Sequence, residues 1–153
     1  MGVYNFHIFD SAGNCLFSLN RSDRIDQQKI LYGFLYSLKS FTARMSPVLA
    51  KDNSFFLFST SGYHLVFCEF PTSIKFVLIL TADMRNDSDF YRELLGQLYR
   101  EIYVQYIVKN PLIAPSVGAV NTGANLSAEK HNTFDCELFR NHLHIFLTQN
   151  SLL

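Results

Sequence analysis

The sequence predicts an α+β domain whose elements follow the order ββαβββαα. Three observations support this class. The length of 153 residues suits one domain, since most domains run to about 100–150 residues. Five short runs are rich in β-branched and aromatic residues and are separated by turn residues. Three longer segments carry apolar residues with helical periodicity, and no period repeats along the chain.

The first two strands are expected to form a hairpin. Residues 3–9 alternate well enough to be a strand, residues 10–14 supply turn chemistry, and residues 15–19 form a second short strand.

A helix is expected at residues 26–45, because Ser46-Pro47 stops it: proline disfavours helical geometry in the residue before it. Its apolar residues gather into one broad arc at about 100° per residue, and this arc is expected to be an ordinary core face. The arc consists of Ile30, Leu31, Phe34, Leu35, Leu38, Phe41 and Met45.

The same helix has an outer side that needs an explanation. Tyr32 and Tyr36 are expected to point away from the core. Gly33, Ser37 and Ser40 form a strip of small residues on one flank. A glycine inside a helix costs about 1 kcal/mol relative to alanine, so close approach by a neighbour is the expected compensation. The helix is therefore predicted to pack inward and to present an interface outward.

Three further strands are expected at residues 55–60, 63–70 and 74–80. Their connections, 61–62 and 71–73, are short, and such tight connections allow only antiparallel neighbours.

A second helix is expected at residues 89–109, after several N-cap candidates at 86–89 and before Asn110-Pro111, which ends it. Tyr99 and Tyr103, four residues apart, extend its apolar arc sideways. Its expected core face consists of Leu94, Leu95, Leu98, Ile102 and Tyr106.

Residues 114–133 lack periodicity and form too long a loop for a compact domain, so they are interpreted as a flexible insertion in a single domain that spans 1–153. A last amphipathic helix is expected at residues 134–149. Its expected inward side consists of Leu138, Phe139, Leu143, Ile145 and Phe146.

The composition excludes some partners and favours others. Thirteen basic and thirteen acidic residues give a net charge of zero, and the basic residues are scattered, which argues against nucleic acid and against an anionic membrane patch. Hydrophobic residues make up 48% and charged residues only 17% of the chain, below the usual quarter. So much apolar material on a small domain predicts that another protein covers some of it.

Cysteine usage indicates a reducing compartment. Cys15, Cys68 and Cys136 are far apart and odd in number, which argues against a disulfide framework. No targeting signal is evident, and the longest aliphatic run, residues 76–80, is far short of the roughly 20 residues of a spanning helix. We therefore expect a soluble cytosolic protein.

A search for reaction chemistry favours no cofactor and no metal. The sequence has no glycine-rich phosphate loop, nucleophile elbow or paired-cysteine metal spacing. The nearest metal constellation is His131, Cys136, His142 and His144, but on one helix His142 and His144 diverge by about 200°. We expect His142 to be a hydrogen-bonded core histidine.

Several segments of the chain occur together in a known combination. They are YNFHIFD (4–10) with Gly13, LYGFLYSLKSF (31–41) followed by MSP (45–47), TSGYHL (60–65), and IYV (102–104) with VKNPL (108–112). This combination resembles the longin-fold subunits of the TRAPP vesicle-tethering complex. The resemblance covers about residues 1–113 and, more loosely, 134–149, with departures at Ser73, 20–28 and 114–133.

The resemblance implies a longin/profilin-like fold, with a five-stranded antiparallel sheet, the first helix on one face and the two later helices on the other. It implies a non-catalytic subunit of a complex that binds a Rab GTPase and promotes nucleotide exchange in transport from the endoplasmic reticulum to the Golgi. Its partners would be other TRAPP subunits, both longin-like and larger α/β chains, and its location cytoplasmic and peripheral at cis-Golgi and endoplasmic-reticulum vesicles.

The candidate site is an interface on the two longer helices. Aromatic anchors commonly dominate such surfaces. The predicted contact residues are Tyr32, Tyr36, Lys39, Tyr99 and Tyr103, with Gly33, Ser37 and Ser40 as a close-packing strip.

Two other hypotheses stay open. One is a longin-like adaptor subunit of a vesicle coat that binds a peptide. The other is a small cytosolic enzyme with His64 or His142 as its base, which requires a pocket with at least two convergent polar side chains.

Overall fold

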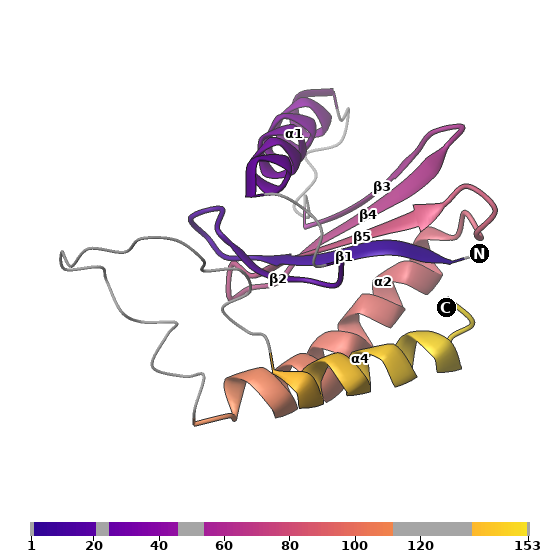
Figure 1. Ribbon diagram of the computed structural model, residues 1–153. Helices are drawn as coiled ribbons and strands as arrows, with labels where there is room; N and C mark the ends of the chain where they lie inside the picture. Colours follow the sequence, from indigo (N-terminus) through magenta and orange to yellow (C-terminus); the bar gives the residue numbers. More distant parts are fainter. Residues whose placement is uncertain (1, 21–24, 46–53, 112–135, 153) are drawn as a thin grey trace, which may run out of the picture.

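The computed structural model describes residues 2–20, 25–45, 54–111 and 136–152. In these residues a five-stranded antiparallel sheet carries helix α1 on one face and the segments α2, η1 and α4 on the other (Figure 1). This confirms the α+β class and the expected distribution of helices over the two faces. The predicted insertion at 114–133 lies outside the described residues.

The strand boundaries agree with those predicted to within one residue. The strands are β1 (Val3–Phe9), β2 (Cys15–Ser18), β3 (Phe55–Ser59), β4 (Tyr63–Glu69) and β5 (Lys75–Thr81). Their order in the sheet is β2-β1-β5-β4-β3. The hairpins β1–β2, β3–β4 and β4–β5 follow from short connections, whereas the β1–β5 pair joins the two halves of the chain. As a result β3 is an edge strand.

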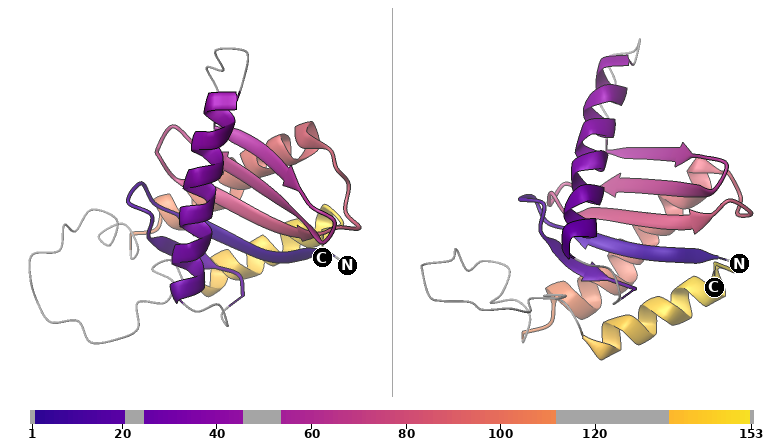
Figure 2. Two further views of the ribbon diagram at one scale, coloured as in Figure 1. Left: turned by 90° about the horizontal axis from the view of Figure 1, so that it is seen from above. Right: turned by 45° about the horizontal axis from the view of Figure 1, so that its top comes forward.

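The helical segments are α1 (Ile25–Met45), α2 (Ser88–Gln97), the π-helical η1 (Leu98–Val108) and α4 (Glu137–Gln149). Helix α1 crosses the strands rather than running along them (Figure 2). Asp87 is the N-cap of α2, and its side chain accepts a hydrogen bond from the Phe90 N–H at 3.2 Å.

The two faces of the sheet are buried very unequally. On the α2 and α4 side, aromatic rings interlock between layers: Phe17 meets Phe139 of α4 at 4.9 Å, and Phe76 meets Tyr103 of η1 at 5.5 Å. On the α1 side the buried cluster is small, and only one of its members comes from α1. This α1 cluster consists of Phe9, Leu35, Leu65, Phe67 and Val77.

The prediction of one uniform α-helix over residues 89–109 is wrong in its second half. In η1 the backbone turn is wider, as shown by the Lys109 N–H, which bonds to the Val104 carbonyl five residues back at 3.0 Å. Buried positions therefore recur every four to five residues. Tyr103 and Ile107 enter the core, while Tyr106 is only half-buried.

Tyr99 and Tyr103 belong to an aromatic stack that covers the β4–β5 turn. The Tyr99 ring stacks on Phe70 at 4.1 Å and on Tyr103 at 5.1 Å, and its hydroxyl lies 3.1 Å from the Thr72 Oγ1. Tyr103 is 4% exposed, and burial together with the nearby Tyr99 raises its pKa to about 12. Both rings therefore stabilise the fold.

Helix α4 buries a narrower arc than predicted. Its buried residues are Phe139, Leu143, Phe146 and Leu147. The expectation that Leu138 and Ile145 face inward is wrong: they lie about 100° or more around the helix from Phe139, and both are exposed. His142 is half-buried rather than in the core, its Nδ1 lies 2.8 Å from the Leu138 carbonyl, and its ring stacks on Tyr106.

Burial of His7 predicts a loss of stability in acid. Its side chain is 2% exposed, and desolvation lowers its pKa from 6.5 to about 4. Between these two pKa values the unfolded chain binds more protons than the folded chain. The free energy of unfolding is therefore unaffected by the protonation of His7 above pH 6.5 and falls as the pH drops toward 4. When urea unfolding is measured at pH 7.5 and at pH 4.5, the free energy of unfolding should drop between the two by about 2–3 kcal/mol more in wild type than in His7→Gln. His144→Gln, at an exposed position, should behave as wild type. Equal losses in wild type and His7→Gln would contradict this account.

The aromatic stack predicts a contrast between two tyrosines. Tyr99→Ala removes a ring that packs on Phe70 and Tyr103, so the free energy of unfolding should fall by about 2–4 kcal/mol. Tyr36→Ala removes an exposed ring and should change it by less than about 0.5 kcal/mol. Denaturant titration of the purified chain measures both free energies of unfolding. If Tyr99→Ala changes this value as little as Tyr36→Ala does, the stack does not stabilise the fold.

Candidate partner interface around helix α1

The apolar arc of α1 is mostly exposed, contrary to the prediction of an ordinary core face. Leu35 is buried and Leu31 and Leu38 are half-buried. Four other apolar residues are between 40% and 72% exposed: Ile30, Phe34, Phe41 and Met45. The reason is geometric, because a helix that crosses a sheet touches it along one line, and no second helix covers this side within the described ranges.

These four residues form one stripe, which we call the α1 apolar stripe. At about 100° per residue they lie on the same flank of the helix, some 80–140° around from Leu35. Within the stripe, the Phe34 ring meets Phe58 of strand β3 edge-on at 5.8 Å. In the described part of the chain no strand pairs with the outer side of β3, so the stripe contacts a free edge strand at Phe34.

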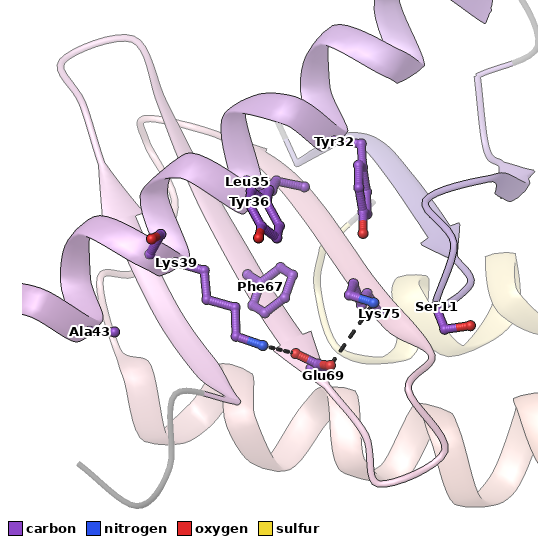
Figure 3. Close-up of a pocket in the computed structure, with 10 residues that line it drawn as sticks. Ser11, Tyr32, Leu35, Tyr36, Lys39, Ala43, Phe67, Glu69 and Lys75 are labelled. Atoms are coloured by element: carbon purple, nitrogen blue, oxygen red, sulfur yellow. Dashed lines mark hydrogen bonds and ion pairs between the residues drawn. The ribbon is translucent and has the colours of Figure 1, made fainter. Parts of the chain in front are cut away.

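A cleft of about 390 Å³ opens on the opposite flank of α1 (Figure 3), and we call it the lysine cleft. Its floor is the Phe67 ring of β4, and α1 forms one wall. The residues that line it are Ser11, Tyr32, Leu35, Tyr36, Lys39, Ser40, Ala43, Phe67, Glu69 and Lys75.

Tyr32, expected to point outward, packs instead against the β1–β2 turn. Its ring lies 5.5 Å from Phe9 and reaches over Gly13 so closely that a Cβ at position 13 would come within 2.6 Å of it. Gly13 also has φ of +90°, which favours glycine. Tyr32 therefore attaches α1 to the sheet and is only half-exposed, whereas Tyr36 is 69% exposed at the rim of the cleft.

Three charged groups meet in the lysine cleft. The Lys39 ammonium of α1 donates to Glu69 Oε2 at the end of β4, and Lys75 Nζ of β5 lies 3.9 Å from Glu69 Oε1. Lys75 also donates to the carbonyls of Asp10 and Ser73, each at 3.3 Å. The prediction included Lys39 but missed Glu69 and Lys75, because strand register rather than spacing brings them together.

Gly33, Ser37 and Ser40 are all exposed on α1, and Ser40 also lines the lysine cleft. A Cβ at Gly33 would meet nothing within 4 Å, and the Ser37 hydroxyl donates to the Gly33 carbonyl at 3.0 Å. The close approach expected at this strip is thus not provided by the described residues. Its packing role stays a prediction about a partner.

A second cleft of about 380 Å³ lies on the stripe side of α1, between the helix and the sheet. Its lining is mostly apolar and aromatic, and it adjoins the α1 apolar stripe through Phe34. The lining residues are Tyr4, Leu31, Phe34, Gly62, Tyr63, Leu65, Ile79, Leu80 and Thr81.

The two histidines considered as catalytic bases have structural partners. His64 is buried, its Nδ1 lies 2.9 Å from the Ser59 hydroxyl, and its Nε2 lies 3.2 Å from the Ala82 carbonyl. A carbonyl can only accept, so Nε2 carries a proton and donates to Ala82. Neither His64 nor His142 lines either cleft beside α1.

The candidate metal set is not assembled in the part of the chain that is described. His131 lies outside the described residues, and the remainder holds no group of three His, Cys, Asp or Glu side chains placed to bind an ion. Over the same residues, no helix has the length and apolar character needed to cross a bilayer.

Comparison with known proteins shows similarity along most of the chain. The trafficking protein particle complex subunit 1 of Dictyostelium discoideum is 30% identical over 158 residues, which cover 96% of this chain and 95% of that protein. The Homo sapiens protein of the same name is 36% identical over 119 residues, with coverages of 73% and 79%. The trafficking protein particle complex subunit BET5 of Saccharomyces cerevisiae is 32% identical over 129 residues, with coverages of 75% and 77%.

These relatives confirm the resemblance inferred from the sequence segments. The Sybindin-like family matches residues 3–121, which include the whole five-stranded sheet, α1, α2 and η1. Because that match spans more than half of the sequence, the chain belongs to the Sybindin-like family.

Proposed function

We propose that this chain is a non-catalytic subunit of a TRAPP-type vesicle-tethering complex and that the α1 side binds neighbouring subunits. The assembled complex would act as a guanine-nucleotide exchange factor for a Rab GTPase in transport from the endoplasmic reticulum to the Golgi. The chain would work in the cytoplasm, held at cis-Golgi and endoplasmic-reticulum vesicles through the complex.

The observation that carries this proposal is the exposed α1 apolar stripe. Its side chains recur along one flank of a helix, and Phe34 among them contacts the edge strand β3 and lines a mostly apolar cleft. Contiguous exposed apolar surface of this kind marks a protein interaction site on a small domain. Several Sybindin-like relatives carry names that make them subunits of a particle complex, and this supports the choice of sister subunits as partners.

The proposed exchange reaction requires binding and no covalent chemistry by the exchange factor. An exchange factor accelerates nucleotide release by binding the nucleotide-free GTPase more tightly than the loaded form. A subunit contributes by holding the surfaces that recognise this form in place. The structural roles of His64 and His142 are consistent with a non-catalytic subunit. Both ring nitrogens of His64 and the Nδ1 of His142 lie within hydrogen-bond distance of groups in the fold.

Substitution of Phe41 tests the proposal. Phe41 is 59% exposed, so Phe41→Ala should leave the melting of the isolated chain within about 2 °C of wild type. If a sister subunit buries this ring, recovery of co-eluting chains in affinity purification from the native cell should fall at least about tenfold. Mass spectrometry of the eluate identifies the partners and measures their amounts.

The matched control is Leu138→Ala, which truncates an equally exposed apolar residue on α4, on the other face of the sheet. It should leave recovery unchanged. Full recovery with Phe41→Ala would refute the α1 interface. Recovery of vesicle-coat subunits in place of small longin-like chains would refute the TRAPP assignment and favour the coat-adaptor hypothesis.

A further inference from the structure

We propose that the lysine cleft binds an acidic segment of a partner polypeptide, which places one Asp or Glu carboxylate beside Lys75 and an adjacent apolar side chain over Phe67. The proposal rests on the proposed function for the existence of a partner on the α1 side. It adds the chemistry that the partner presents there.

The first argument is the charge balance of the cleft. Two ammonium groups face a single carboxylate, so the group Lys39, Glu69 and Lys75 carries one surplus positive charge. The pairing is also uneven: Lys39 contacts Glu69 directly, whereas Lys75 Nζ stays 3.9 Å from it and otherwise meets two carbonyls at 3.3 Å. The surplus charge therefore resides at Lys75.

The second argument is burial. The Lys75 side chain is 12% exposed, and its ammonium lies 5.9 Å from the centre of the Tyr32 ring. A partner that covers α1 would remove the remaining water from this cation. Such desolvation is costly unless the partner supplies a compensating charge. An acidic side chain meets this requirement, and a neutral or basic one does not.

The third argument is the shape and lining of the cleft. A volume of about 390 Å³ accommodates a few side chains, not a folded element. Leu35, Phe67 and the Tyr32 ring give it apolar walls, while Ser11 and Tyr36 bring hydroxyl groups to its lining (Figure 3). An extended segment with one carboxylate and one apolar side chain matches this combination.

The surplus of one charge favours a carboxylate over a phosphate group. A carboxylate carries one negative charge and brings the cleft to neutrality, whereas a phosphate near neutral pH carries between one and two and would face the Glu69 carboxylate as well. Inorganic phosphate is therefore the competing ligand in the test.

Zero-length cross-linking of the complex isolated from the native cell tests the inference without a variant. A carbodiimide joins a lysine amine to a carboxylate that is in contact with it. Mass spectrometry should find Lys75 or Lys39 joined to an Asp or Glu of another polypeptide. Because phosphate consumes some carbodiimide, 20 mM phosphate should lower this link only as much as it lowers the internal links to Glu69. The intramolecular links from Lys39 and Lys75 to Glu69 report that the reagent reaches the cleft. If only these internal links form, or if phosphate abolishes the intermolecular link, the inference is overturned.

Variants then separate this inference from the proposed function. Lys75→Gln should weaken partner recovery about tenfold and Lys75→Arg should restore it, while Lys109→Gln, at an exposed lysine of the η1 C-cap, should have no effect. Circular dichroism and melting confirm that each variant is folded. Loss of recovery with Phe41→Ala but not with Lys75→Gln would reject the acidic segment and keep the α1 interface. No loss with either would reject both.

Discussion

A β-sheet has two faces, and within the described residues the helices cover one of them far more fully than the other. Three helical segments cover the face that holds Phe6, Phe76 and Leu78, whereas a single helix crosses the other. Leu35 is the one residue of that helix that is buried in the α1 cluster. A helix that crosses strands contacts them along a line, so four residues of its apolar arc stay exposed within the described part of the chain. The candidate interface, both clefts and the proposed partner chemistry all derive from this incomplete cover.

The contacts that hold α1 in place are few and specific. Leu35 fills the space above Val77 and its neighbours, Tyr32 reaches over Gly13, and Lys39 pairs with Glu69. Partly exposed ion pairs contribute little to stability, about 0–1 kcal/mol, so the apolar contacts carry most of the attachment. A partner that covers the α1 apolar stripe would add burial that the described residues do not provide. Under the proposed function, the stability of this helix and the assembly of the complex would therefore be coupled.

Much of the fold could be predicted from the sequence, because turn residues bracket the strands so clearly. Gly13, Gly62 and Pro71 mark connections, and the strand ends fall within one residue of the prediction. The errors have physical causes. The backbone of η1 widens to five-residue hydrogen bonding, which turns Tyr103 into the core, and nothing in its composition signals this. The exposure of Phe34 and Phe41 depends on how little sheet lies below α1. Glu69 and Lys75 meet Lys39 only through the β4–β5 register, which spacing along the chain does not reveal.

The central claim is that another polypeptide buries the exposed side of α1. Hydroxyl-radical footprinting compares side-chain exposure directly in the free chain and in the complex isolated from cells. Phe41 and Met45, 59% and 67% exposed, should react readily in the free chain and should be protected several-fold in the complex, while Leu138 on α4 provides a reference on the other face. Equal oxidation of Phe41 and Met45 in both samples, in a complex that remains intact, would show that no partner covers α1 and would contradict the account.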